Sequence, residues 1–307
     1  MMSNFVDRIS SIEGIQRKEM IEKDILLHQI LLDLSSQKFI SENFLFKGGT
    51  CLIKNYLGYF RFSEDIDFTW KNQEQFVGKT GGEIYKILSP ILDSTAQILV
   101  QIASTRGLDF KWEKGNREYV ELVNGGKICT FKVWYEQATL KTRTFLKIQI
   151  NFIDTMCHRS QQGNLKSLLT GKHQDLDPLF QEYSEYSSTI SLQMYDINEI
   201  LSEKIRALLT RRAIKARDFL DVFFIHKKLG IEPKDVESCV IAKIGFALEN
   251  YEKYRDNFEE KRKLLEKGSI FNWGTEQGLL LEKIDENEFN QFIDNFTKYL
   301  QDLVKKF

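Results

Sequence analysis

The chain has 307 residues, of which 42% are hydrophobic and 28% are charged, and its formal net charge at pH 7 is -1. This balance is typical of a folded globular protein and excludes both a disordered chain and a uniformly basic one. The N-terminal residues lack a signal-peptide pattern, and no stretch approaches the roughly 20 apolar residues of a membrane span. We therefore expect a cytoplasmic protein that makes no membrane contact.

The cysteines do not indicate a metal site or a cross-link. Cys51, Cys129, Cys157 and Cys239 are far apart and form no C-x-x-C pair, so neither a zinc ribbon nor a disulfide framework is predicted. We expect most of them to be small buried apolar residues. The four histidines show no metal-ligand spacing either.

The first half of the chain combines amphipathic helices with strands. Apolar residues recur with helical periodicity over residues 17–37 and again over 83–103, which predicts two helices. Residues 128–137 and 144–154 alternate apolar and polar side chains, as paired strands do. The other expected features are a break at 36–43, a short apolar segment at 44–46, a helix at 50–57, a strand at 62–70 and a polar loop at 71–79.

Residues 44–70 contain the strongest chemical signal of this half. Gly48 and Gly49 precede Asp65 and Asp67, which on a strand would point to one face while Ile66 points to the other. Two adjacent carboxylates repel each other unless a cation lies between them, so a divalent-metal site or a basic partner is expected. A glycine turn that opens a helix presents free N–H groups, which favour a phosphate.

The second half reads as mainly helical. A polar segment at 158–189 predicts a boundary, which we place so that residues 1–160 and 161–307 form two domains. Asp196 followed by Glu199 fits a capping box, so a helix is expected to begin there with Glu199 as part of the cap. The C-terminal residues are expected to form further helices, the last one running to the chain end.

Two cations fall on the apolar stripe of the helix that follows Asp196. Lys204 and Arg211 share this stripe, either because their stems cover apolar surface or because they form one wall of a cleft for an anionic ligand. We favour the cleft, since two aligned cations are harder to explain by snorkelling than one. In the next helix, from about residue 215, Arg217 and Asp221 are spaced for an internal ion pair.

These stretches resemble the motifs of the AbiEii/AbiGii-type nucleotidyltransferase toxins, a branch of the DNA polymerase β-like superfamily that includes the MenT toxins. The family's second motif is a strand lysine, often followed two residues later by an acid; Lys147 fits, but Gln149 stands in the acid's place. The other matching residues are Lys47–Gly48–Gly49–Thr50; Ser63, Asp65 and Asp67 in the run 61–67; Glu199, Lys204, Ala207–Leu208 and Arg211; and Arg217, Asp218 and Asp221.

The resemblance implies an α+β protein: a polymerase β-like nucleotidyltransferase lobe with a mixed sheet and flanking helices, and a helical C-terminal lobe that completes the cleft. It implies that Asp65 and Asp67 hold Mg²⁺ or Mn²⁺, and that Asp218 or Asp221 acts as the base. Because Gln149 is not an acid, either Asp218 or Asp221 substitutes as a metal ligand or only one metal is held firmly. The implied nucleotide-binding residues are Lys47, Gly48, Gly49, Thr50, Ser63, Lys147, Lys204 and Arg211, although Lys147 is equally well explained as a solvated strand lysine.

The implied reaction is transfer of a nucleotide from an NTP to an RNA acceptor, in particular the tRNA 3′ end. The implied biological role is that of a toxin in a toxin-antitoxin or phage-defence system, with a cognate antitoxin protein as partner. Two alternatives stay open at this point. The same site could modify a protein hydroxyl, or the chain could be a nucleotide-binding or interaction module without turnover.

Overall fold

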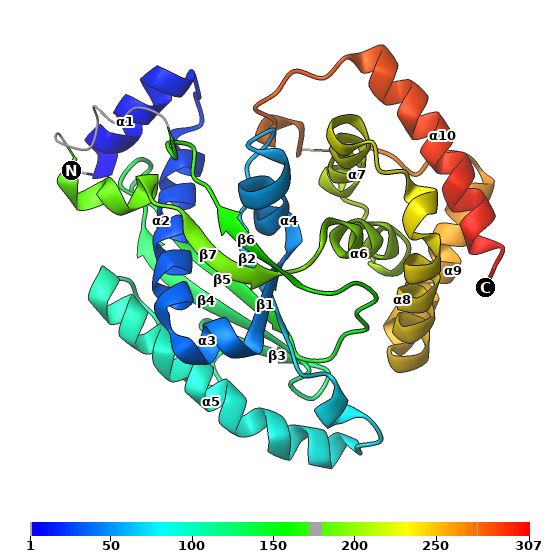
Figure 1. Ribbon diagram of the computed structural model, residues 1–307, viewed down its shortest axis with the longest axis horizontal. Coiled ribbons are helices and arrows are strands. Elements are labelled where there is room, and N and C mark those ends of the chain that lie inside the picture. Colours follow the sequence, from blue (N-terminus) through cyan, green and yellow to red (C-terminus); the bar gives the residue numbers. More distant parts are fainter. Residues whose placement is uncertain (1, 172–179, 275) are drawn as a thin grey trace. The chain divides into compact units, whose positions relative to one another are not determined.

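The computed structural model describes residues 2–171, 180–274 and 276–307 (Figure 1). The chain divides into two compact units, the first formed by residues 1–154 and 160–194 and the second by residues 155–159 and 195–307. Residues 161–194, which we expected to open the second domain, therefore belong to the first unit. They contribute two strands that we did not predict. One of these strands is the polar run QQGNL, which shows no apolar alternation.

The first unit contains a seven-stranded sheet and the helices around it. Its strands are β1 (Phe44–Lys47), β2 (Asp65–Trp70), β3 (Val120–Val123), β4 (Ile128–Glu136), β5 (Arg143–Asn151), β6 (Gln161–Leu165) and β7 (Ile190–Met194). Its helices are α1 (Met2–Glu13), α2 (Lys18–Ser36), α3 (Lys38–Asn43), α4 (Gly48–Cys51), the π-helical η1 (Leu52–Leu57), the 3₁₀ turns η2 (Glu74–Phe76) and η4 (Gln181–Ser187), and α5 (Gly81–Arg106).

The sheet is mixed, with the strand order β3-β4-β5-β2-β1-β7-β6. β2 runs parallel to β5 and antiparallel to β1, so the strand that carries both aspartates lies in the interior of the sheet. Ile66 and Phe68 point to the face where side chains are fully buried, whereas Asp65 and Asp67 point to the other face. The expected α+β class and the expected alternation of faces in this strand are both confirmed.

Most of the predicted elements of this unit are present, with three differences. The break expected at residues 36–43 is helix α3, which buries Ile40. The strand expected from residue 62 begins at Asp65, and the helix expected from residue 50 begins already at Gly48. The predicted helix at 83–103 is α5, which begins at a capping box between Thr80 and Glu83. Among the described helices, only α5 meets the length and composition criteria of a membrane span, which buried core helices also meet.

A buried ionic cluster ties α2 to the helical run that follows the glycine turn. The ammonium of Lys54, in η1, lies 2.9 Å from a carboxylate oxygen of Asp24, and both side chains are at most 3% exposed. The hydroxyls of Tyr59 and Tyr186 donate to the second oxygen of Asp24 at 2.8 and 2.6 Å. Because each buried charge has a partner, removal of one member would leave the others unpaired in the core. This cluster fixes the far end of the run that begins at Gly48.

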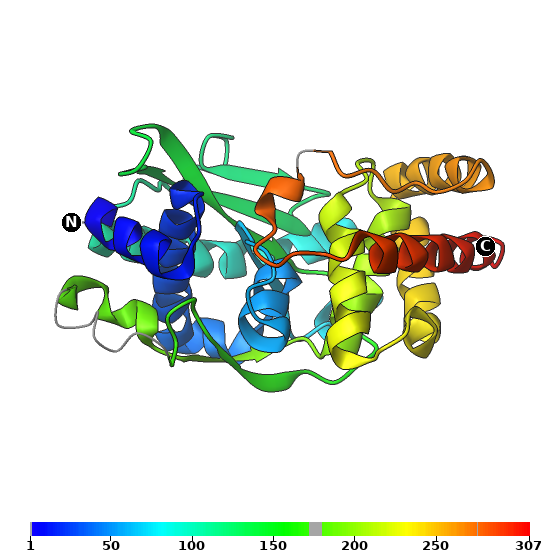
Figure 2. The same ribbon diagram turned by 90° about the horizontal axis from the view of Figure 1, so that it is seen from above.

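The second unit is helical. It consists of α6 (Ile197–Thr210), α7 (Ala216–Leu229), the 3₁₀ turn η5 (Pro233–Val236), α8 (Glu237–Asn250), α9 (Glu252–Glu266), the 3₁₀ turn η6 (Glu276–Leu279) and α10 (Glu286–Val304). Figures 1 and 2 show α9 and α10 side by side, and Gln301 of α10 donates to the carbonyl of Leu265 in α9 at 2.7 Å. Phe219 and Phe223 of α7 pack against Phe296 and Phe289 of α10, so aromatic rings form the core between these helices.

The buried histidine of α2 predicts a pH-dependent stability. Burial and the neighbouring Lys54 ammonium lower the pKa of His28 to about 3 from its ordinary value of 6.5. Between pH 6.5 and about 3, His28 is therefore protonated in the unfolded chain but neutral in the folded chain. As the pH falls through this range, the free energy of unfolding decreases by up to about 1.4 kcal/mol per pH unit. His28→Gln should show a shallower loss in urea unfolding. Equal slopes in the two proteins would contradict this assignment.

Candidate active site

The turn after β1 brings the main chain against one of the two aspartates. Gly48 has φ +82°, a conformation that favours glycine, and a Cβ built on it would overlap Oδ2 of Asp67. A Cβ on Gly49 would lie 2.8 Å from a guanidinium nitrogen of Arg61 and 3.0 Å from the Ser63 hydroxyl. Glycine is therefore required at residue 48, and an added side chain at residue 49 would have to displace Arg61 and Ser63. The result is a helix start packed directly on the acid-bearing strand.

The hydroxyl of Thr50 fixes the beginning of that strand. It donates to the main-chain carbonyl of Asp65 and lies 2.9 Å from the hydroxyl of Ser63. Thr50 is 1% exposed, whereas Ser63 is half-buried. Thr50 thus acts on the position of Asp65, and Ser63 is the more accessible of the two hydroxyls that the sequence indicated.

The neighbours of the two aspartates on their face of the sheet are set by strand register. Asp65 lies opposite Lys147 of β5, and Asp67 lies between Gln149 of β5 and Lys47 of β1. The side chain of Lys147 makes no hydrogen bond or ion pair with any residue that the structure describes. Its ammonium is therefore available to a ligand beside Asp65.

Lys47 is instead paired within the protein. Its ammonium lies 2.9 Å from Oδ2 of Asp154, and the two side chains are 11% and 8% exposed. Asp154 follows the end of β5, where its main-chain N–H donates to the side chain of Gln73 at 2.9 Å. Asp154 was not predicted as a site residue, because its contact with Lys47 joins two segments 107 positions apart in the sequence. Asp154 is thus a carboxylate, in addition to Asp65 and Asp67, that lies near the glycine turn because it pairs with Lys47.

The second set of predicted residues comes together within the helical unit. The ammonium of Lys204 in α6 lies 2.9 Å from Asp218 and 2.6 Å from Asp221, which are one turn apart on α7. Arg211, just past the end of α6, lies 3.4 Å from the second oxygen of Asp218. Burial alone would raise the pKa of the Asp218 carboxyl, but Lys204 and Arg211 outweigh burial and hold that pKa below its usual range. Asp218 is therefore ionised at neutral pH.

The expectation that Glu199 forms part of the helix cap is wrong. Asp196 caps α6 by accepting from the N–H of Asn198, whereas Glu199 is 1% exposed and pairs with Lys243 at 2.6 Å. Glu199 is drawn inward because it also accepts the main-chain N–H groups of residues 157 and 158 at 2.9 and 2.8 Å. The guanidinium of Arg217 lies 3.6 Å from a carboxylate oxygen of Glu276, and a carboxylate oxygen of Asp221 lies 2.6 Å from the ammonium of Lys204.

The cysteines also differ from the prediction. Cys157 and Cys239 form a disulfide that joins the short segment 155–159 to α8. The two residues are 82 positions apart in the sequence, and spacing gave no indication that they meet. Cys51 and Cys129 are buried and free, as expected of small apolar residues.

The chemistry of the strand acids fits a hard divalent cation. Asp65 and Asp67 offer carboxylate oxygens from one face of one strand, and the main chain at Gly48 leaves no room for a side chain beside Asp67. Mg²⁺ and Mn²⁺ prefer such oxygen ligands. The cluster of Cys157, Glu199 and Cys239 has its sulfurs in the disulfide and its carboxylate paired with Lys243, so it fits a metal poorly.

Comparison with known proteins gives one family match and two similar structures. The profile of the family described as "Nucleotidyl transferase AbiEii toxin, Type IV TA system" matches residues 29–306. The structure of JHP933 from Helicobacter pylori has a TM-score of 0.44 at 17% identity, over 94% of each chain. A second H. pylori structure, described as a candidate nucleotidyltransferase, has a TM-score of 0.43 at 17% identity over 93% of this chain and 96% of the other. No curated protein matches the sequence significantly.

Gly48→Ala should weaken metal binding in addition to straining the backbone. A Cβ at a left-handed position costs about 1–2 kcal/mol, and at residue 48 it must in addition displace the Asp67 carboxylate. Gly58→Ala is the matched control, because Gly58 has φ +73° but nothing within 4 Å of its added Cβ. We expect both variants to lose stability in urea unfolding and only Gly48→Ala to lose Mn²⁺ binding in calorimetry. Wild-type Mn²⁺ binding by Gly48→Ala would refute the close-approach argument.

Lys204→Met should destabilise the helical unit strongly near neutral pH. It leaves Asp218 and Asp221, which are 2% and 0% exposed, without their central cation, and removing one partner of a buried ion pair costs about 3–5 kcal/mol. Because Lys204 helps to hold the pKa of Asp218 low, the loss should shrink at acidic pH, where the unpaired Asp218 carboxyl takes up a proton. Lys305→Met, which removes an exposed pair with Asp302, should change stability by less than about 1 kcal/mol. A similar small effect of both variants would contradict the buried role of Lys204.

Proposed function

The chain belongs to the AbiEii family of nucleotidyl transferase toxins of type IV toxin-antitoxin systems, and from this premise we propose that it transfers a nucleotide from an NTP to an RNA acceptor. The proposed acceptor is the 3′ end of tRNA. The observation that carries the proposal is the packing of the Gly48 turn against Asp67, which joins a phosphate-binding element to a pair of metal-binding acids. The enzyme is thus a nucleotidyltransferase with its reaction centre at the turn after β1.

The main-chain N–H groups of the helical run that begins at Gly48 are proposed to bind the triphosphate. Free N–H groups and the helix dipole both favour an anion at such a start. Ser63 and Lys147 supply a further hydroxyl and an unpaired ammonium on the same side. Lys47 contributes through its pair with Asp154, which holds a positive charge next to the turn.

Asp65 and Asp67 are proposed to hold Mg²⁺ or Mn²⁺. When bound, the cation supplies charge neutralisation at the phosphates and orients the leaving pyrophosphate. The two residues are held in place, because the Thr50 hydroxyl donates to the main-chain carbonyl of Asp65 and the Gly48 main chain bounds the side chain of Asp67. Asp154 is the acid that could take the place of the missing carboxylate at Gln149.

The helical unit is proposed to bind the outer phosphates through Lys204 and Arg211 and to position the attacking hydroxyl through Asp218 or Asp221. This part rests on the match of these residues to the family motifs and on the ion pairs among them. Ionised Asp218 can accept a hydrogen bond from a hydroxyl. Arg211, whose side chain is 42% exposed, is the more accessible cation of the two.

The biological part of the proposal is a cytoplasmic toxin whose activity is countered by a cognate antitoxin. A direct assay combines the full chain, each radiolabelled NTP, Mg²⁺ and total tRNA. Label in RNA supports the proposal, and absence of label from RNA with every NTP overturns it. Label on polypeptide alone would establish a protein hydroxyl as the acceptor, and binding of NTP without any transfer would indicate a nucleotide-binding module.

Asp65→Asn and Asp67→Asn should abolish transfer and preserve the fold. Losing a carboxylate ligand removes several kcal/mol of transition-state stabilisation, which corresponds to a rate loss on the order of 10³-fold. The matched control is Glu64→Gln, because Glu64 is the preceding residue but binds Lys23 of α2 at 3.1 Å. Circular dichroism checks the fold and the labelling assay measures the rate. Equal rates for Asp65→Asn and Glu64→Gln would refute the assigned role.

A further inference from the structure

A strip of aromatic and basic side chains continues the face of the sheet that carries the aspartates. We define the strip as Lys147, Lys132, Phe145, Trp134 and Arg143, all on β4 and β5. Strand register places Asp65 opposite Lys147, Lys147 opposite Lys132, and Phe145 opposite Trp134. The strip therefore extends from the metal-binding acids outward along the two strands.

Side chains in the strip stack on one another. The rings of Trp134 and Phe145 have centroids 4.9 Å apart, and the guanidinium of Arg143 lies over the Trp134 ring at 4.4 Å. The indole N–H donates to the carbonyl of residue 118 at 2.9 Å, which fixes the orientation of the ring. Lys132 lies over Phe145 at 5.8 Å. The two rings are tilted by 57° to each other, and each has a cation over it, so the strip is a preformed stacked cluster of side chains.

The strip is not part of the hydrophobic core. Trp134 and Phe145 are half-exposed, while their neighbours Val133, Tyr135 and Leu146 point to the opposite face and are buried. Cross-strand aromatic pairs do stabilise sheets on their own. Two observations go beyond that role: the strip is in register with Asp65, and Lys147 has no partner among the described residues.

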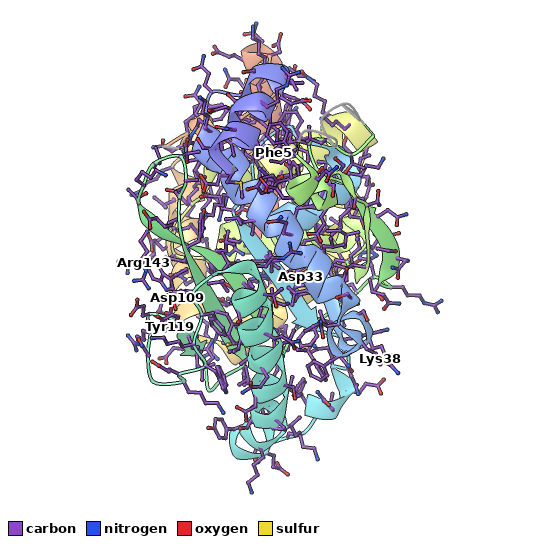
Figure 3. The ribbon with its side chains drawn as sticks, turned by 90° about the vertical axis from the view of Figure 1, so that its left-hand side faces the viewer. Phe5, Asp33, Lys38, Asp109, Tyr119 and Arg143 are labelled. Atoms are coloured by element: carbon purple, nitrogen blue, oxygen red, sulfur yellow. A yellow bond between two sulfur atoms is a disulfide. The ribbon has the colours of Figure 1, made fainter. Side chains whose placement is uncertain are left out.

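The charges of the strip fit an occupant that binds by stacking. Arg143 is neutralised by Asp109 and Glu118, each at 2.8 Å, and Figure 3 shows Arg143 and Asp109 close together at this end of the sheet. Lys132 lies 3.6 Å from Glu121. Lys147 is thus the one cation of the strip that remains free for a phosphate. A duplex that needs many phosphate contacts would be poorly served by such a surface.

We infer that the strip binds the single-stranded end of the RNA acceptor, with unpaired bases on the Arg143–Trp134–Phe145 cluster and a phosphate at Lys147. This inference rests on the proposed function. Unpaired bases stack on aromatic rings and on guanidinium planes. Because Lys147 lies opposite Asp65, an RNA bound along the strip would have its terminus near Asp65. The strip therefore selects an acceptor with a free single-stranded terminus and excludes paired ends.

Binding of a short fluorescent oligoribonucleotide with the tRNA 3′ sequence CCA, measured by anisotropy, tests the inference. Trp134→Leu should raise the Kd by about 5- to 150-fold, as expected for loss of one base stack. Trp134→Phe should stay within about threefold of wild type, because it keeps an aromatic plane. An unchanged thermal unfolding temperature in both variants shows that the sheet is intact.

Trp112 provides the matched control within the same unit. It also carries a lysine over its ring, Lys114 at 5.1 Å, but it packs against Phe131 on the opposite face of the sheet. Trp112→Leu should leave the Kd within about twofold of wild type. Equal losses in Trp112→Leu and Trp134→Leu, equal losses in Trp134→Phe and Trp134→Leu, or no binding by wild type would each overturn the inference.

The labelling assay separates this inference from the proposed function. If the wild-type protein labels RNA but the Trp134 variants bind the oligoribonucleotide with wild-type affinity, the inference about the strip is overturned while the proposed function stands. A wild-type protein that labels only polypeptide would overturn the RNA acceptor without any variant being needed.

Discussion

The contact between the Gly48 main chain and the Asp67 carboxylate is the constraint on which the candidate site depends. It holds only because residue 48 has no side chain and adopts a positive φ. The contact fixes where the helical run starts, and the buried Lys54–Asp24 pair fixes where that run is anchored on α2. A helix start and two acids are thereby held close together on the sheet.

Buried charge shapes both units, although in different ways. In the first unit Lys47 and Asp154 form a nearly buried pair beside the glycine turn. In the helical unit Lys204 lies between two carboxylates that water does not reach. Such groups are costly to bury, and replacing them by apolar residues is often neutral or stabilising. Their presence at the motif residues is therefore better explained by function than by stability.

The sequence predicted the parts of the fold that rest on local pattern and missed those that rest on distant contacts. The periodicity of α2 and α5, and the faces of Asp65 and Asp67, follow from spacing alone. Glu199 fits a cap by position, but tertiary contacts with Lys243 and the segment 155–159 decide its role. Asp154 and the Cys157–Cys239 disulfide depend on chain reversals that no periodic signal records. Strand β6 was not predicted, because its polar sequence shows no alternation of apolar and polar residues.

The central claim is that Asp65, Asp67 and the Gly48 turn form the metal and nucleotide site proposed for this chain. The most direct test is anomalous X-ray scattering from crystals grown with Mn²⁺ and a non-hydrolysable NTP analogue. The account predicts a manganese peak bound by Asp65 and Asp67, with the triphosphate on the main chain of Gly48 and Gly49. A manganese ion elsewhere, or a triphosphate that avoids the glycine turn, would contradict it.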